Sequence, residues 1–192
     1  MAFPDDLLEL AQGLANLHPE SPHQASLRRA VSTACYALFH LLISEATANW
    51  ARFELRAILG RCFDHGLMET ASETKVSQIN SAFKRNPPEG AEKTVAIYLR
   101  TVANAFIQAQ QRCNDADYNM AWEWTPVEVD TQIASVNEAF DAWNVIRDEA
   151  VAQAYLVSLL STKERRPIEP KLPKAKVERK KQRRDLETPP TA

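Results

Sequence analysis

The sequence predicts an all-α protein, an up-and-down bundle of four to six helices followed by a disordered basic C-terminal tail. Three observations lead to this expectation. Only 4 of the 192 residues are glycine, and runs of β-branched residues are few, which favours helix over strand. Apolar residues recur at spacings of three and four over long segments. Short connections, some of them proline-containing, separate these segments, as they do in helical bundles.

Composition changes near residue 161. Residues 1–161 contain 12 Lys and Arg against 20 Asp and Glu, whereas residues 162–192 contain 11 against 5, together with five of the 11 prolines and no aromatic residue. A segment of the second kind cannot bury enough apolar area to offset its ordering entropy. We therefore expect one helical domain over residues 1–161 and a disordered basic tail over residues 162–192. The acidic body is atypical of a general nucleic-acid binder, whereas the tail could contact nucleic acid, a membrane surface or an acidic partner.

Local sequence patterns predict the first two helices. One begins after Pro4, and acidic residues in its first turn suit the positive end of the helix dipole. A longer helix is predicted over residues 23–50, where Ala30, Ala34 and Ala37 are small enough to let a neighbouring helix approach closely. At about 40 Å in length, it is expected to be the central helix.

Two weaker helices are expected next. The first covers residues 53–63 and ends at Gly66, because glycine is a common C-terminal stop, with His65 as a cap. The second covers residues 75–83, and a firm break follows at residues 86–90.

Two stronger helices complete the domain. One is predicted over residues 91–116. The last begins near Pro126, with Thr125 as its N-cap, and continues or restarts near Asp148.

Several classes of protein and site are disfavoured. The N-terminus lacks the positive region of a secretory signal, and the longest apolar run, residues 37–43, is too short to span a bilayer. Cys35, Cys62 and Cys113 are too far apart in the sequence for a disulfide framework or a metal motif. Glycine-rich phosphate loops and zinc-protease or hydrolase motifs are absent from the sequence. We expect a cytoplasmic protein without a cofactor, a metal or a membrane partner.

One polar cluster lies on the predicted central helix. Arg29, Thr33, Tyr36 and His40 are spaced by four, three and four residues, so they share one face. Such a face could be the wall of a site, with arginine for phosphate and histidine for proton transfer. A structural interpretation stays open, because tyrosine and histidine often lie at the rim of a core.

A second polar cluster, Arg112, Asp115, Asp117 and Tyr118, lies where the predicted helix 91–116 meets a turn. It could be a salt-bridge cluster that stabilises the helix end, although functional groups also concentrate at such exposed turns. A third pair, Arg61 and His65, is interpreted as part of a helix terminus.

These clusters lie within segments that resemble a known family. Residues 26–40, SLRRAVSTACYALFH, resemble the second-helix signature of small bacterial HEPN proteins, with Cys35 in place of one tyrosine of a pair. Residues 110–119, QQRCNDADYN, resemble the later arginine motif of the same proteins, and residues 61–66, RCFDHG, resemble this subgroup as well. The resemblance covers residues 5–160.

The resemblance implies a bundle of four or five helices, commonly a homodimer. In active HEPN members an arginine is followed, after four to six residues, by a histidine. The two residues meet their copies across the dimer and cleave RNA without metal. Such proteins often act as toxins or in phage defence, beside a nucleotidyltransferase-type antitoxin partner.

Carried onto this chain, the resemblance places the arginine at Arg112 and the histidine position at Asp117 or Tyr118. Neither side chain replaces an imidazole near neutral pH, because an ordinary aspartate is ionised there and cannot donate a proton. His40 could substitute if its helix faces Arg112. The catalytic motif is therefore expected to be degenerate.

Three hypotheses follow. The first is a HEPN-like protein that binds RNA, a nucleotide or a partner protein, with Arg29 and Arg112 on phosphate and Tyr36 and Tyr118 stacking or hydrogen-bonding. The second is a metal-independent ribonuclease toxin that uses Arg112, Asp117 and His40. The third is a structural adaptor without a ligand, in which the polar clusters only fix helix packing.

Overall fold

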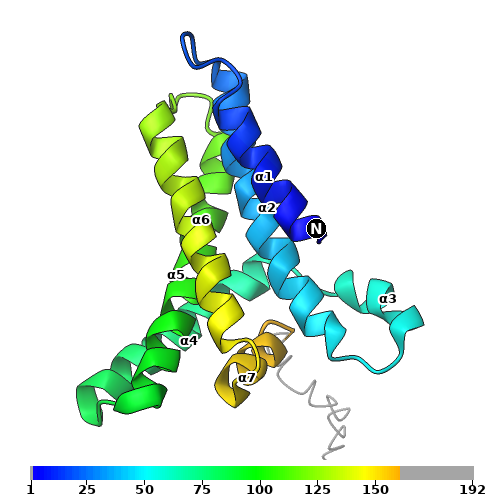
Figure 1. Ribbon diagram of the computed structural model, residues 1–192, viewed down its shortest axis with the longest axis vertical. Helices are drawn as coiled ribbons and strands as arrows, with labels where there is room; N and C mark the ends of the chain where they lie inside the picture. The colour runs from blue at the N-terminus through cyan, green and yellow to red at the C-terminus, as the bar shows by residue number, and fades with distance from the viewer. Residues whose placement is uncertain (1, 161–192) are drawn as a thin grey trace, which may run out of the picture.

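The computed structural model describes residues 2–160 (Figure 1). In this part of the chain seven α-helices and one 3-10 helix are present and strands are absent, so the predicted all-α bundle is confirmed. This number exceeds the four to six helices expected, because it includes two short helices of 5 and 9 residues. The tail predicted for residues 162–192 lies outside the described residues.

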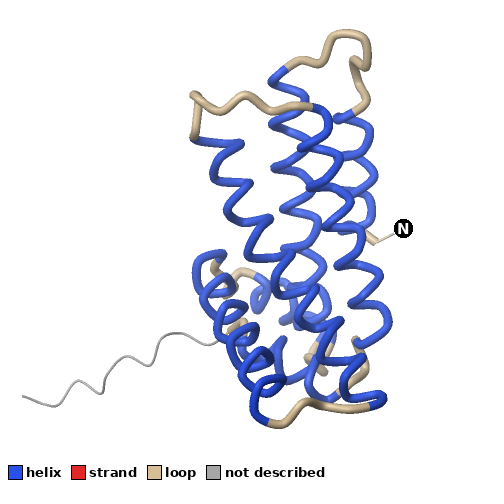
Figure 2. Tube along the Cα trace, turned by 90° about the vertical axis from the view of Figure 1, so that its left-hand side faces the viewer, coloured by secondary structure: helices blue, strands red, loops and turns tan. Residues whose placement is uncertain are grey.

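Five helices of 13 to 29 residues make up most of the described domain. In chain order the elements are α1 (Phe3–Ala15), α2 (Gln24–Ala48), the 3-10 helix η1 (Phe53–Leu55), α3 (Arg56–Gly60), α4 (His65–Arg85), α5 (Gly90–Tyr118), α6 (Pro126–Ile146) and α7 (Ala150–Ser158). Helix α2 packs against α1, α5 and α6, which run alongside it up and down the bundle (Figures 1 and 2). Helix α4 packs against the lower part of α5, and α7 closes the lower end.

The central position of α2 explains its apolar composition. Ala30, Ala34 and Ala37 are completely buried, as expected for small residues that let neighbouring helices approach. Within residues 2–160, α2 is the one helix long and apolar enough to cross a membrane, but 61% of its most apolar stretch is buried inside the protein. Its apolar side chains therefore serve the core of the bundle.

The helix around His65 differs from the prediction. Residues 53–63 form the short η1 and α3, and Gly66 does not end a helix, because α4 already begins at His65. The carboxylate of Asp64 accepts a hydrogen bond from the backbone N–H of Leu67 at 3.0 Å and caps this helix. An aspartate N-cap thus starts a helix where the glycine had been interpreted as a stop. The weak segment 75–83 is the second half of the 21-residue α4.

The predicted start of α6 is confirmed. The Thr125 hydroxyl accepts from the backbone N–H of Glu128 at 3.3 Å, and the Glu128 carboxylate accepts from the N–H of Thr125 at 2.9 Å. This reciprocal pair is a capping box, and Pro126 occupies the first turn, where its missing N–H costs nothing. Helix α6 ends at Ile146 and the chain restarts as α7 at Ala150, close to the restart expected near Asp148.

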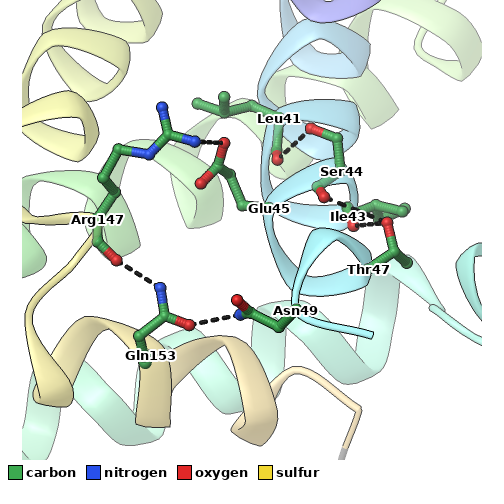
Figure 3. A network of polar contacts seen from close by, with 8 residues as sticks. All are labelled: Leu41, Ile43, Ser44, Glu45, Thr47, Asn49, Arg147 and Gln153. Atoms are coloured by element: carbon green, nitrogen blue, oxygen red, sulfur yellow. Dashed lines mark hydrogen bonds and ion pairs between the residues drawn. The ribbon is translucent and has the colours of Figure 1, made fainter. Parts of the chain in front are cut away.

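Polar contacts fix the lower corner of the bundle (Figure 3). Arg147 at the end of α6 forms an ion pair of 2.6 Å with Glu45 of α2. The side chain of Gln153 on α7 donates to the backbone carbonyl of Arg147 and accepts from Asn49. These contacts join α2, α6 and α7 where the chain turns.

Candidate ligand-binding sites

The predicted site residues fall into two groups on different sides of α5. Arg112 and Asp117 are five residues apart, and at 3.6 residues per turn their side chains leave the helix about 140° apart. Asp117 contacts α2, whereas Arg112 lies against the tryptophans that precede α6. In the described part of the chain, Arg112 makes no hydrogen bond or ion pair with Asp117.

The first group lies beside α2 and is here called the tyrosine–histidine face, formed by Tyr36, His40, His65, Asp117 and Tyr118. The Tyr36 ring stacks on His40, with centroids 6.3 Å apart, and meets the His65 ring edge-on at 5.7 Å. The Tyr118 side chain is 81% exposed and that of Tyr36 is 39% exposed. Partial burial raises the pKa of the Tyr36 hydroxyl, and the negative charge of Asp117 adds to the shift.

Two small side chains, one on α2 and one on α5, donate hydrogen bonds to Asp117. Its carboxylate accepts from the Ser32 hydroxyl at 3.2 Å and from the Cys113 thiol at 3.6 Å. Asp117 therefore orients toward α2, as a site wall would require, and the contact also serves helix packing.

The two histidines of the face are kept neutral at pH 7. Burial lowers the pKa of His40, whose ring packs edge-on against Phe3 at 5.0 Å and Phe39 at 5.3 Å. Burial also lowers the pKa of His65, with Asp64 opposing the shift, and the His65 ring lies 3.7 Å from the Phe39 ring. Spacing had grouped His65 with Arg61. The start of α4 instead brings it to Tyr36 and His40, and no sequence spacing could have indicated this.

Arg28, rather than the predicted Arg29, makes the close contacts of α2. The Arg28 guanidinium donates to the backbone carbonyls of Ala116 at 2.8 Å and Asn119 at 2.9 Å, and to that of Trp122. It therefore caps the C-terminal end of α5, where unpaired carbonyls carry partial negative charge. The Arg29 side chain is exposed and available to a ligand.

The second group borders a groove between α5 and α6. The Arg112 guanidinium lies over the ring of Trp122 at 5.4 Å and over that of Trp124 at 5.9 Å, which is a cation–π geometry. The groove has a volume of about 540 Å³ and is also lined by Asp115 and Glu128. Together these residues define the α5–α6 groove. Sequence reasoning missed the tryptophans, although they follow Arg112 closely in the chain.

The thiols and possible metal ligands do not extend either site. A hydrogen bond with Cys113 and burial raise the pKa of Cys35 well above the ordinary thiol value, so Cys35 is a neutral thiol at pH 7. Cys62 is exposed and free. Within residues 2–160, groups of three or more His, Cys, Asp or Glu side chains able to hold a metal ion are absent.

Comparison of the chain with protein-family models, curated proteins and solved structures gave no match.

Proposed function

We propose that this protein is a HEPN-like helical bundle that binds RNA without cleaving it. The observation that carries this proposal is the separation of Arg112 from Asp117 by the body of α5. Metal-independent cleavage by the HEPN arrangement needs an arginine and a proton-transferring side chain at one phosphate. Within one chain, Arg112 instead contacts the tryptophans before α6, and Asp117, at the histidine position, contacts α2.

The tyrosine–histidine face supplies the chemistry for binding a single strand. Tyr36 and Tyr118 expose aromatic rings, and stacking of a base on such a ring contributes about 1–3 kcal/mol in single-strand binding. Arg29, seven residues before Tyr36 on the same side of α2, offers a guanidinium for phosphate. Because the domain is acidic overall, stacking rather than bulk charge would hold the strand, with the basic tail as an additional contact.

A ribonuclease is the second candidate, and one observation favours it. His65 joins Tyr36 and His40 on the face that also contains Asp117. The chain thus has a neutral imidazole pair beside the histidine position of the motif. A homodimer could bring the Arg112 of one subunit to this face of the other.

The cellular setting that we propose comes from the resemblance to HEPN proteins. We place the protein in the cytoplasm, as a homodimer in a toxin–antitoxin or defence system with a nucleotidyltransferase-type antitoxin partner. Size measurement of the purified protein by light scattering tests the dimer directly, since a monomer at micromolar concentration would remove the ribonuclease route.

The test measures binding and cleavage together. A labelled single-stranded RNA is mixed with the full-length protein in EDTA, and its anisotropy and its length are both followed. Binding without cleavage is expected, with affinity reduced about 5–150-fold by Tyr36→Ala or Tyr118→Ala. Phe53→Ala is the matched control, because Phe53 is also an exposed aromatic residue, 77% exposed, but lies on η1.

Other outcomes separate the hypotheses. Cleavage that persists in EDTA and disappears in Arg112→Ala would establish the ribonuclease. Absence of both binding and cleavage, in a protein with a normal unfolding curve, would favour the structural adaptor.

A further inference from the structure

Buried side chains form the inner wall of the α5–α6 groove. Trp124 is 2% exposed and Gln132 is 7% exposed, and both residues line the groove. The indole N–H of Trp124 and the side-chain amide nitrogen of Gln132 are buried without a hydrogen-bond partner. Both nitrogens are closed to the groove as well as unpaired, and so are those of His65, Trp122 and Trp143 among the described residues. A ligand in the groove would therefore contact the groups that the groove exposes.

Arg112 is an exposed donor at this groove. Arg112 stacks on the tryptophan rings, and within residues 2–160 its guanidinium has no hydrogen-bond or ion-pair partner. Stacking uses the face of the guanidinium and leaves its N–H edge free for a planar acceptor such as a carboxylate.

The tryptophans are fixed in place by α2. The side chain of Gln24 donates to the backbone carbonyl of Trp124 at 2.7 Å and accepts from its N–H at 2.9 Å. Arg28 donates to the carbonyl of Trp122. The wall of the groove is therefore preorganised before any ligand enters, which reduces the ordering cost of binding.

The charges of the groove select among acceptors. Asp115 and Glu128 also line it, so one positive and two negative side chains surround the space. Hydrogen bonds from Thr125 lower the pKa of Glu128, which is therefore ionised near neutral pH. A phosphate monoester, with nearly two negative charges, would be repelled by both carboxylates. A ligand that carries one carboxylate and one ammonium group would match both signs.

We propose that the α5–α6 groove binds a free α-amino acid. Arg112 holds the ligand carboxylate, and Asp115 and Glu128 hold its ammonium group. The groove, at about 540 Å³, has room for the ligand side chain, and the exposed Val127 offers it an apolar contact. The site is separate from the tyrosine–histidine face, so it does not depend on the proposed RNA binding.

The first experiment screens ligands. Thermal unfolding of the full-length protein is followed with each of the twenty common L-amino acids and with inorganic phosphate at equal ionic strength. At a concentration ten times its Kd, a true ligand is expected to raise Tm by about 3–6 °C. The amide and the N-acetyl derivative of that amino acid should give no shift, because each lacks one of the two charges. The absence of a shift with every amino acid, or an equal shift with phosphate, would overturn the proposal.

The second experiment tests the residues by calorimetric titration with the amino acid found. Arg112→Gln should abolish binding, because the ligand carboxylate loses its charged donor. Asp115→Asn should weaken binding about tenfold or more, because the ammonium group loses a charged partner. Arg100→Gln, an arginine of the same helix outside the groove, should bind normally. Binding that survives both Arg112→Gln and Asp115→Asn would refute the assignment, and RNA affinity measured on the same variants reports on the other face independently.

Discussion

Arg28 and Arg29 are neighbours on α2 with opposite surroundings. Arg28 donates to three backbone carbonyls at the end of α5, whereas the side chain of Arg29 is exposed. We expect Arg28→Met to lower the free energy of unfolding by about 2–4 kcal/mol, because partly buried carbonyls lose a charged donor. Urea unfolding measures the change.

Arg29→Met is the matched control for Arg28→Met. It removes the same guanidinium from the adjacent position and should change stability by less than about 0.5 kcal/mol, as exposed substitutions usually do. Equal losses in the two variants would show that Arg28 does not cap α5.

The sequence could not distinguish these two arginines. Arg29 was selected because it shares a helical face with Tyr36, which is a local property. The partners of Arg28 are 88 to 94 residues away in the chain, and only tertiary packing identifies them. The same limit applies to His65, whose aromatic neighbours come from α2.

His40 and His65 should make stability depend on pH. Burial lowers the pKa of both side chains below the ordinary histidine value, so the unfolded chain binds protons more readily than the folded protein. Their contribution to stability is therefore complete above the ordinary value of about 6.5 and is lost as pH falls below it. We expect Tm to decrease between about pH 7.5 and about pH 5.5.

A double variant isolates the histidine effect. His40→Gln with His65→Gln should flatten the dependence of Tm on pH in that window. His18→Gln with His23→Gln, two exposed histidines of the loop before α2, should leave it unchanged. A slope unaltered by the first pair would assign the pH dependence to other groups.

At the scale of elements, the start of α4 depends on one carboxylate. Asp64 caps the helix through Leu67, and the helix then brings His65 to Tyr36. Asp64→Ala should cost about 1 kcal/mol of stability, the usual cost of losing an N-cap. Glu73→Ala, an exposed position within the same helix, is the control, and thermal unfolding compares the two. A loss no larger than that of Glu73→Ala would contradict the capping role.

Helix boundaries were predictable where two local signals agree. Thr125 as a cap and Pro126 in the first turn both indicate a start, and α6 begins there. At residues 64–66 the signals conflict, because Asp64 favours a start and Gly66 favours a stop. The structure resolves the conflict in favour of the cap, since the rest of α4 buries Met68, Ser72 and Ile79 against the bundle.

At the scale of the whole molecule, the periodicity of apolar residues was sufficient to predict the fold, whereas the sites required the packing. The apolar stripes of α2, α5 and α6 describe which faces are buried, and that determines a bundle. Whether Arg112 and Asp117 meet depends on which neighbour each side of α5 contacts. The sequence contains both residues in one motif, and the helix turns them to different partners.

The basic tail permits a last prediction about the molecule as a unit. Among the described residues the buried hydrophobic core extends from Leu8 to Leu159. We expect deletion of residues 162–192 to leave the free energy of unfolding unchanged. The deletion removes 11 Lys and Arg, and RNA affinity should fall and depend less on salt. If the tail contacts about four phosphates, the slope of log K against log salt should lose about 3 units.

The control for this deletion removes only residues 188–192, which contain no charged side chain. Its RNA affinity and salt slope should match those of the full chain, because counterion release depends on the cations that remain. Anisotropy titrations at several salt concentrations measure both quantities. An unchanged slope after the longer deletion would mean that the strand is held without the tail. Stacking on Tyr36 and Tyr118, together with the phosphate contact of Arg29, would then have to supply the whole affinity.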